Sequence, residues 1–195
     1  MSCIFKYVLT GGPCTGKTTL LNFFGQQGYQ TVSESATIIM QQEREKGNVR
    51  PWDDLIYFQT LLLNKQIEME SKLQIWPQAF ADRGTLDGLA YCKLFNTHPP
   101  AELIKRASEN RYAGVFMLDF LPFYTLEGVR FESARSAYKI QNLLKQTYQE
   151  FGYQIIEVPV FEIGIRAEFI LNKIDYSFSQ PQGIKTRIHE DAKSR

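Results

Sequence analysis

The pattern G-x-x-x-x-G-K-[ST] is completed by Gly11, Gly16, Lys17 and Thr18, and this spacing is typical of a phosphate-binding loop. Glycines let the backbone bend tightly, so that successive N–H groups converge on a phosphate. Lys17 is long enough to reach the β and γ phosphates of a nucleoside triphosphate, and the Thr18 hydroxyl can bind Mg²⁺. We expect nucleotide contacts along the whole loop, from Gly11, Gly12, Pro13, Cys14, Thr15, Gly16, Lys17, Thr18 and Thr19.

The residues on either side of this loop support the interpretation. An apolar, β-branched run at 4–9 predicts a strand before it, and the apolar spacing over 16–26 predicts a helix after it, with a stop at Gly28. A glycine-rich strand-to-helix turn with a chance lysine is the alternative, and this context disfavours it. The chain is therefore expected to bind ATP or GTP with Mg²⁺. We expect Lys17 to face solvent when no nucleotide is bound.

Three acidic residues follow predicted strands. Glu34 follows a strand at 29–32, Asp82 a strand at 78–81, and Asp119 a strand at 114–118. The carboxyl ends of parallel strands face the ligand crevice of an open sheet, so these carboxylates are expected there. Asp82 is a candidate Mg²⁺ ligand with Thr18, and either Asp82 or Glu34 could act as general base. As structural alternatives, Glu34 would favour a helix N-terminus and Asp82 would cap a helix.

Basic residues are the candidates for stabilising a phosphoryl group in transfer. Arg83 follows Asp82 directly and can brace a phosphate. Arg130, Arg135 and Lys139 follow an aromatic segment, 120–132, that contains a proline and a glycine and could close over a nucleotide. The alternative for these three cations is a solvated helix face.

A long helix is predicted from Trp52 to about Leu73, with Gln59 and Gln66 two turns apart on one face. These glutamines could contact a base or ribose edge, but solvated side chains are the favoured interpretation. Neither His98 nor His189 has the spacing of a metal ligand.

Apolar runs alternate with helical patterns along the chain, which predicts an α/β fold with a parallel sheet. We expect a single domain over 1–174 with a fifth strand at 153–158 and a last helix at about 161–173. Residues 175–195 have the polar composition of a tail with little fixed structure.

The formal net charge is +1, and the basic C-terminal segment 176–195 carries +2 of it. The rest of the chain is nearly neutral, which argues against nucleic-acid binding. Three cysteines without C-x-x-C spacing are expected to be free thiols in a reducing compartment. With no predicted signal layout or membrane-spanning run, we expect the cytosol.

Further motifs add to the phosphate-binding loop. They are Glu34-Ser35-Ala36, Asp82-Arg83-Gly84, Leu86 to Tyr91, Leu118-Asp119, Gly128-Val129-Arg130, Thr147-Tyr148, 152–159 and Arg166. With these motifs the chain resembles, over about 5–174, the P-loop family called AAA domain. That family includes the nicotinamide-riboside kinase domain of the bacterial NAD regulator and a eukaryotic trafficking protein that binds nucleotides and phosphoinositides.

The resemblance implies a fold like that of nucleoside and nucleotide kinases, with five parallel strands and an arginine-bearing lid. It implies that Lys17 and Thr18 hold the triphosphate and Mg²⁺, that Asp82 and Arg83 position acceptor and metal, and that Arg130 and Arg135 are lid arginines. The chain departs from the family at Glu127, where we expect an aspartate, and at Thr37, where we expect an arginine that could contact substrate.

Two hypotheses follow from the sequence. The first is a Mg²⁺-dependent phosphotransferase that moves the γ-phosphoryl group of ATP or GTP to a nucleoside-like or other small hydroxyl acceptor. The second is a nucleotide-dependent switch with slow hydrolysis, whose basic tail and aromatic segment 120–124 contact a membrane surface or a protein partner. The acceptor and the oligomeric state do not follow from the sequence.

Overall fold

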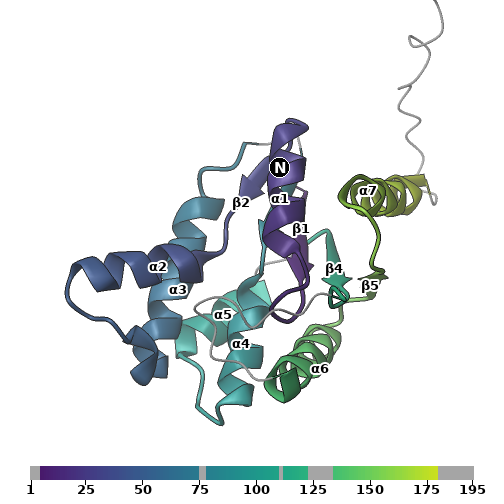
Figure 1. Cartoon of the computed structure of the whole chain (residues 1–195). Coiled ribbons are helices and arrows are strands. Elements are labelled where there is room, and N and C mark those ends of the chain that lie inside the picture. The colour runs from purple at the N-terminus through teal and green to yellow at the C-terminus, as the bar shows by residue number, and fades with distance from the viewer. Residues whose placement is uncertain (1–4, 75–77, 110–111, 123–133, 180–195) are drawn as a thin grey trace, which may run out of the picture.

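The computed structural model describes residues 5–74, 78–109, 112–122 and 134–179. Its centre is a parallel sheet of five strands in the order β2-β3-β1-β4-β5 (Figure 1). The strands are β1 (Lys6–Thr10), β2 (Gln30–Val32), β3 (Ala79–Asp82), β4 (Gly114–Leu118) and β5 (Ile155–Val158). The predicted α/β fold with five parallel strands is confirmed.

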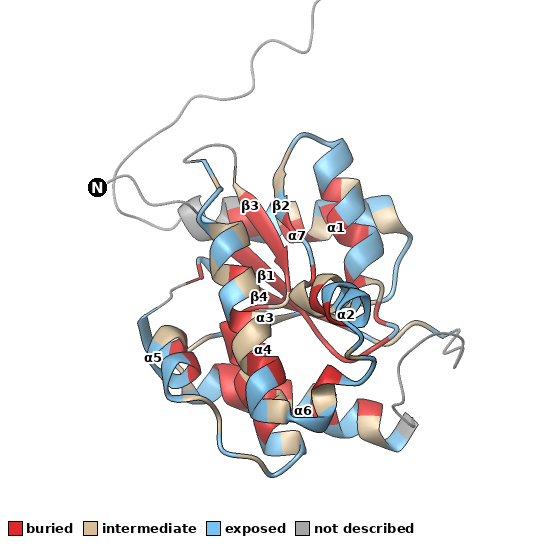
Figure 2. Cartoon of the chain, turned by 90° about the vertical axis from the view of Figure 1, so that its left-hand side faces the viewer, coloured by how far each residue is buried: buried red, intermediate tan, exposed pale blue. Residues whose placement is uncertain are grey.

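Helices cover both faces of the sheet. The helices are α1 (Lys17–Gln26), α2 (Ser35–Glu45), α3 (Leu55–Glu70), α4 (Thr85–Leu94), α5 (Ala101–Glu109), α6 (Ala134–Glu150) and α7 (Ile163–Ser179). The core residues of α1 and α7 pack on one face, those of α3, α4, α5 and α6 pack on the other, and α2 lies against α3. Figure 2 shows the central strands as buried and the outer sides of the helices as exposed.

Aromatic packing fixes α1 on the sheet. The rings of Phe24 in α1 and Phe80 in β3 are stacked, with centroids 3.9 Å apart, and Tyr29 meets both rings edge-on. Phe24 and Phe80 are fully buried, and each such side chain contributes about 1.5–3 kcal/mol to folding. Because α1 begins at Lys17, this packing also fixes the phosphate-binding loop above the carboxyl end of β1.

Two predicted helix boundaries were wrong. Residues 51–53 form a separate 3-10 turn, and α3 begins only at Leu55, because the Asp54 side chain accepts a hydrogen bond from Tyr57 N and caps the helix there. At the other end, α7 continues to Ser179, six residues beyond the predicted end at Lys173. The first residues of the predicted polar tail are therefore helical, and residues 180–195 lie outside the described part of the chain.

Candidate active site

The phosphate-binding loop (P-loop, residues 11–18) connects β1 to α1 through a backbone that only glycine adopts easily. Gly11 has φ 136° and Gly16 has φ 82°. A Cβ atom on Gly11 would lie 2.9 Å from the carbonyl oxygen of Leu118, so a side chain has no room there. Cys14 is exposed and has φ 57°, a left-handed conformation that is costly for a residue with a side chain. The loop conformation therefore explains both glycines of the motif.

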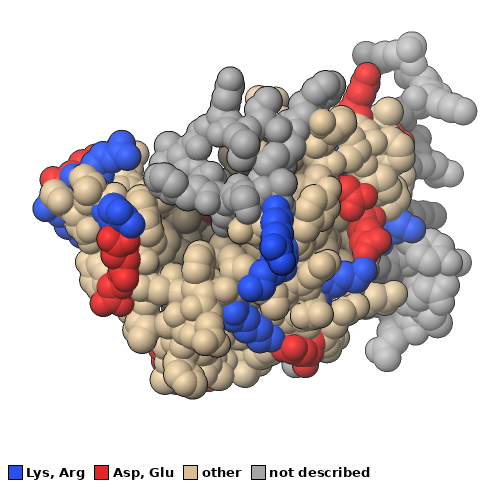
Figure 3. Space-filling view, turned by 60° about the horizontal axis from the view of Figure 1, so that its bottom comes forward, with Lys and Arg blue, Asp and Glu red and all other residues tan. Residues whose placement is uncertain are grey.

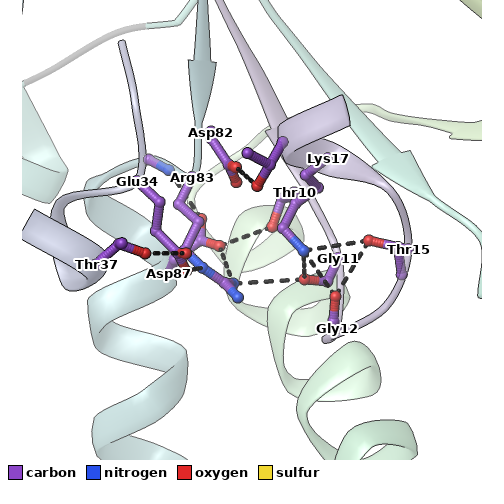
Figure 4. Close-up of polar contacts among 12 residues, drawn as sticks. Thr10, Gly11, Gly12, Thr15, Lys17, Glu34, Thr37, Asp82, Arg83 and Asp87 are labelled. Carbon is purple, nitrogen blue, oxygen red and sulfur yellow. Dashed lines mark hydrogen bonds and ion pairs between the residues drawn. The ribbon is translucent and has the colours of Figure 1, made fainter. Parts of the chain in front are cut away.

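Lys17 is bent back over the loop in the structure (Figure 4). Its ammonium group donates to the carbonyl oxygens of Gly11 (3.0 Å) and Gly12 (2.7 Å) and to Thr15 Oγ1 (3.1 Å). The residue is 4% exposed. The expectation that Lys17 faces solvent without nucleotide was therefore wrong, because the loop's own carbonyl groups supply hydrogen-bond acceptors for the amine.

Thr18 and Asp82 meet across the carboxyl edge of the sheet. Thr18 Oγ1 donates a hydrogen bond of 2.7 Å to Asp82 Oδ2, while Asp82 Oδ1 is buried and has no hydrogen-bond partner among the residues that the structure describes. Burial raises the pKa of Asp82, as does the nearby Glu34 carboxylate, whereas Lys17 and Thr18 act in the opposite direction. A buried carboxylate with one unpartnered oxygen beside a hydroxyl group fits an oxygen-seeking cation such as Mg²⁺. The alternative that Asp82 caps a helix is wrong, because Gly84 occupies the N-cap position of α4.

Asp82 and Thr18 would form only a sparse donor set for a metal ion. Within the described ranges there is no group of three or more His, Cys, Asp and Glu residues that could hold a metal ion. Mg²⁺ in nucleotide sites is commonly held by one or two protein oxygens together with phosphate oxygens and water. The donor set is therefore compatible with an ion that arrives with the nucleotide.

Arg83 lies between two carboxylates. Its Nε donates to Glu34 Oε1 (2.7 Å) and its Nη1 to Asp87 Oδ1 (3.2 Å) (Figure 4). The guanidinium group also lies over the Tyr91 ring, 5.3 Å from its centroid. Burial alone would lower the pKa of Arg83, but Tyr91, Glu34 and the other nearby carboxylates hold it well above its ordinary value. Arg83 has φ 77°. Such backbone strain is concentrated at functional sites in proteins.

Asp87 is a functional candidate that the sequence analysis did not single out. It accepts hydrogen bonds from Thr10 Oγ1 (2.9 Å), Gly84 N (3.0 Å) and Tyr148 OH (2.6 Å) in addition to Arg83. It therefore joins β1, α4 and α6 beneath the arginine. Burial, followed by the charge of Asp87, raises the pKa of Tyr148 well above its ordinary value. The sequence signals were its place in the motif Leu86 to Tyr91 and its spacing of four residues from Arg83.

A cavity of about 160 Å³ opens beside Arg83, between α2 and α3 on one side and α4 on the other. Its charged part is formed by Glu34, Arg83 and Asp87. The remaining wall is largely apolar and includes Met40, Phe58, Leu62, Leu63, Tyr91 and Leu103. A mostly apolar cavity with a few convergent polar groups is the usual form of a small-molecule site.

Both glutamines of α3 line this cavity, so the expectation that they are solvated was wrong. Gln66 is 8% exposed and donates to Glu70 Oε1, Arg83 O and Tyr112 OH at 3.0–3.4 Å. Gln59 is 4% exposed, and nothing within the described ranges forms a hydrogen bond with its amide. Gly88 makes room for the amide, because a Cβ there would lie 2.8 Å from Gln59 Oε1. A buried amide at a cavity wall implies a polar ligand group.

The other predicted site residues lie outside this group. Arg130 falls outside the described residues, as does most of the segment 120–132. Arg135 is exposed in the first turn of α6. Asp119 follows β4 as predicted, but it is exposed and its charge acts on Arg166. The structure therefore brings together Lys17, Thr18, Glu34, Asp82 and Arg83 but not Asp119.

Arg166 supports the P-loop from behind. It is 2% exposed, and its Nη1 donates to the carbonyl oxygen of Thr15 at 2.9 Å. Its Nε is buried and has no hydrogen-bond partner in the described ranges. Burial lowers the pKa of Arg166, although Asp119 acts against this effect. The loop is thus held between β1, α1 and the buried guanidinium group of α7.

On one face of the described chain, the basic side chains do not form a continuous patch. On the face shown in Figure 3, Lys and Arg side chains lie in short groups, most of them next to Asp or Glu, with uncharged atoms between the groups. Several of the basic side chains form ion pairs, such as Lys72 with Glu68 and Lys145 with Glu157. None of the described helices is both long and apolar enough to cross a membrane.

The sheet order and the P-loop define the class: the chain has the fold of P-loop nucleoside and nucleotide kinases. It is similar to the NadR protein in complex with NR (TM-score 0.63, 15% identity, 94% of this chain and 52% of that chain). It is also similar to thymidylate kinase from Ehrlichia chaffeensis (TM-score 0.61, 10% identity, 87% of this chain and 98% of that chain). A third similar structure is deoxyadenosine kinase from M. mycoides with dCMP and dCDP (TM-score 0.60, 15% identity, 88% of this chain and 100% of that chain).

Within that class, a family model described as AAA domain matches residues 6–164, and the chain belongs to this family. The predicted resemblance is therefore confirmed. The chain spans about half the length of the NadR protein. No curated protein sequence matches it.

Proposed function

We propose that the chain is a Mg²⁺-dependent phosphotransferase that moves the γ-phosphoryl group of ATP or GTP to a nucleoside-like or other small hydroxyl acceptor. The observation that carries the proposal is the cavity of about 160 Å³ at Glu34 and Arg83. Arg83 connects this cavity to the P-loop, because its Nη1 also contacts the carbonyl oxygen of Gly11 at 3.4 Å. A protein that only senses a nucleotide needs the loop but no second small-molecule site. The similar solved structures include proteins named as thymidylate and deoxyadenosine kinases.

The P-loop would hold the triphosphate. Its N–H groups converge on the phosphates at the N-terminus of α1, where the helix dipole adds positive potential. Lys17 would keep its bond to Gly11 O, while phosphate oxygens would replace Gly12 O and Thr15 Oγ1 as its other acceptors. Thr18 and Asp82 would hold Mg²⁺, which neutralises charge on the phosphates when bound.

The two carboxylates would have separate roles. Asp82 contacts Thr18 on the P-loop side, so it serves the metal. Glu34 lines the cavity, and Arg83 fixes its orientation through a 2.7 Å ion pair. The acceptor oxygen would bond to the γ-phosphorus while the bond to the bridging oxygen breaks. The acceptor proton would pass to Glu34, and the nucleoside diphosphate would leave.

The cavity wall indicates the chemistry of the acceptor. The Tyr91, Phe58, Leu62 and Leu103 side chains favour a flat or apolar group. The buried Gln59 amide offers one donor and one acceptor, which match a lactam or carboxamide edge such as those of nucleobases. The acceptor would therefore combine a hydroxyl group near Glu34 with a neutral ring that has an amide-like edge.

Arg130 and Arg135 keep their proposed role as cations that approach the transferred phosphoryl group. Such cations stabilise charge that develops in the transition state. The alternative function is a nucleotide-dependent switch without an acceptor, in which a protein partner or membrane surface responds to the bound nucleotide.

A transfer screen tests the proposal. The purified chain would be incubated with Mg-ATP or Mg-GTP and a panel of nucleosides and other small alcohols, and ³¹P NMR and mass spectrometry would detect any new phosphate ester. We expect Mg²⁺-dependent phosphorylation of at least one compound with an amide-like ring edge, and none with Lys17→Ala. Tight nucleotide binding with no phosphorylated compound would favour the switch.

A further inference from the structure

Gln141 of α6 forms a bridge between the P-loop and the end of β4. Its Oε1 accepts a hydrogen bond from Gly12 N (2.5 Å), and its Nε2 donates to the carbonyl oxygen of Leu118 (3.2 Å). The two partners are 129 and 23 residues away in the sequence. Both polar groups of the amide are therefore used, one on each of two segments next to the nucleotide site.

The bond to Gly12 N determines the orientation of the Gly11–Gly12 peptide. A trans peptide is planar, and its N–H and C=O point in opposite directions. On the other side of this peptide, Gly11 O accepts from Lys17 Nζ (3.0 Å) and more weakly from Arg83 Nη1 (3.4 Å). Rotating the peptide would break the bonds on both sides together. Gln141 therefore acts on Lys17 through one rigid peptide.

Both glycines are needed for this close approach of α6. A Cβ on Gly11 would lie 3.3 Å from Gln141 Oε1, and a Cβ on Gly12 would lie 2.8 Å from the Phe120 ring and 3.2 Å from Ala137 O. The Phe120 ring in turn packs against Tyr138 of α6, with centroids 4.9 Å apart. The absence of side chains at these two loop positions thus serves the contact with α6 as well as the turn.

The helix that carries Gln141 is firmly held in the core. Ala137, Ile140 and Leu144, spaced along one side of α6, are at most 1% exposed. Ile140 and Leu144 pack with Met117 of β4 and Ala90 of α4. A shift of α6 would therefore move Gln141 and, with it, the Gly11–Gly12 peptide.

We propose that Gln141 is a positioning residue that fixes the Gly11–Gly12 peptide, sets the location of the Lys17 ammonium group, and so couples the position of α6 to nucleotide affinity. The inference rests on the proposed nucleotide site. It assigns a role to a residue that contacts neither the phosphates nor the acceptor cavity. Because Arg135 lies on the same helix, a shift of α6 would move this candidate cation and the P-loop together.

Two substitutions separate the hydrogen bonds of Gln141 from its volume. Gln141→Leu keeps the size but removes both bonds. Gln141→Glu reproduces an acceptor and a donor only while its carboxyl is protonated, because an ionised carboxylate cannot donate to Leu118 O. Gln146→Leu and Gln146→Glu are matched controls, since Gln146 is exposed on the same helix.

The first measurement is the affinity for Mg-ATP, by calorimetry, on variants whose fold is verified by circular dichroism. We expect Gln141→Leu to lose about tenfold at every pH, the loss typical of one buried partner. Gln141→Glu should match the parent chain at low pH and fall about tenfold behind it at high pH. The Gln146 variants should follow the parent throughout. Affinities of folded Gln141 variants equal to those of the parent would overturn the proposal.

The second measurement uses the protein without nucleotide. In ¹H–¹⁵N NMR spectra, the Gly12 amide proton of the parent should resonate downfield of its position in Gln141→Leu. The side-chain signal of Lys17 should shift in the same variant. This result tests the bridge even if the parent binds no nucleotide, an outcome that would overturn the proposed function. An unchanged Gly12 signal would overturn the bridge itself.

Discussion

Thr18 donates a 2.7 Å hydrogen bond to Asp82, and this bond joins the first turn of α1 to the last residue of β3. One carboxylate oxygen is thereby satisfied, while the other is buried and has no partner within the described part of the chain. Leaving a buried carboxylate oxygen unpaired is unfavourable for the fold. The arrangement is what we expect of a site that gives up stability in order to bind a cation.

Asp82→Asn should therefore raise the stability of the protein and at the same time impair Mg²⁺-dependent nucleotide binding. The amide still accepts from Thr18 but carries no charge, so we expect the nucleotide-free protein to gain about 1 kcal/mol, the gain typical when a strained functional position is relieved. The dependence of ATP affinity on Mg²⁺ should disappear, because the metal ligand is lost. Thermal unfolding and calorimetry with and without Mg²⁺ measure the two effects. A variant that is less stable than the parent would contradict the role given to burial.

The pH dependence of stability provides a second test of Asp82. Because burial raises its pKa in the folded state, the folded chain binds more protons than the unfolded chain between the ordinary aspartate value and the raised value. The contribution of Asp82 to stability is thus fully present below the ordinary value and is lost as the pH rises through that window. Melting temperatures of parent and Asp82→Asn should agree at about pH 3 and diverge toward pH 7, with the variant higher. A constant difference between them would contradict the argument.

Lys17→Ala should abolish measurable Mg-ATP binding and also reduce stability. Removing the side chain deletes the three hydrogen bonds of the buried ammonium group, at a cost of about 1–3 kcal/mol. Chemical denaturation measures this cost. Lys105→Ala is a control, since Lys105 is exposed on α5. Unchanged nucleotide affinity in Lys17→Ala would remove the central assumption of the proposed function.

Cys14 should react readily with a thiol reagent, and bound nucleotide should protect it. Its side chain is exposed within the P-loop, where phosphates would cover it. Cys92 is an internal control, because it is 1% exposed and burial raises the pKa of its thiol. Peptide mapping after maleimide treatment, with and without Mg-ADP, gives the labelling of each cysteine. Equal labelling of Cys14 in both conditions would show that its side chain points away from the ligand.

Gln59→Leu and Gln66→Leu should differ in their effect on the stability of the protein. The Gln59 amide has no hydrogen-bond partner among the residues that the structure describes, so Gln59→Leu should leave stability unchanged or raise it while the KM for the acceptor rises about tenfold or more. Gln66 makes three hydrogen bonds, so Gln66→Leu should cost about 1–3 kcal/mol. Denaturation curves and acceptor kinetics provide the comparison. If Gln59→Leu destabilises the protein as strongly as Gln66→Leu, Gln59 is a structural residue.

The sequence predicted the fold and the position of the P-loop well, because both depend on local signals. Apolar periodicity locates the strands and helices, and the G-x-x-x-x-G-K-[ST] spacing specifies a turn and a helix start. The two wrong helix boundaries depend on weaker local effects. The cap at Asp54 determines where α3 begins, and α7 continues beyond Lys173.

The partners of the site residues were much harder to predict. Glu34 and Asp82 were found from strand ends, but the 61-residue separation of Asp87 and Tyr148 has no local signature. Likewise, the burial of Gln59 depends on how α4 packs against α3, and the apolar periodicity of the sequence does not predict this packing. The prediction that Lys17 faces solvent was wrong because two of its acceptors are backbone carbonyl groups. The directions of these groups depend on loop geometry rather than on residue type.

The last prediction separates a kinase from a switch through Glu34, the residue that ties the acceptor cavity to Arg83. Glu34→Gln keeps an oxygen for the 2.7 Å contact with Arg83 Nε but cannot take up a proton. In a kinase, turnover on the acceptor should fall on the order of a hundredfold or more with little change in Mg-ATP affinity. Glu45→Gln, exposed on the same helix, should have no effect. Steady-state kinetics and calorimetry on the three proteins decide the matter. A switch would instead show altered discrimination between ATP and ADP in Glu34→Gln, with no phosphorylated acceptor from the parent, and that result would exclude the phosphotransferase.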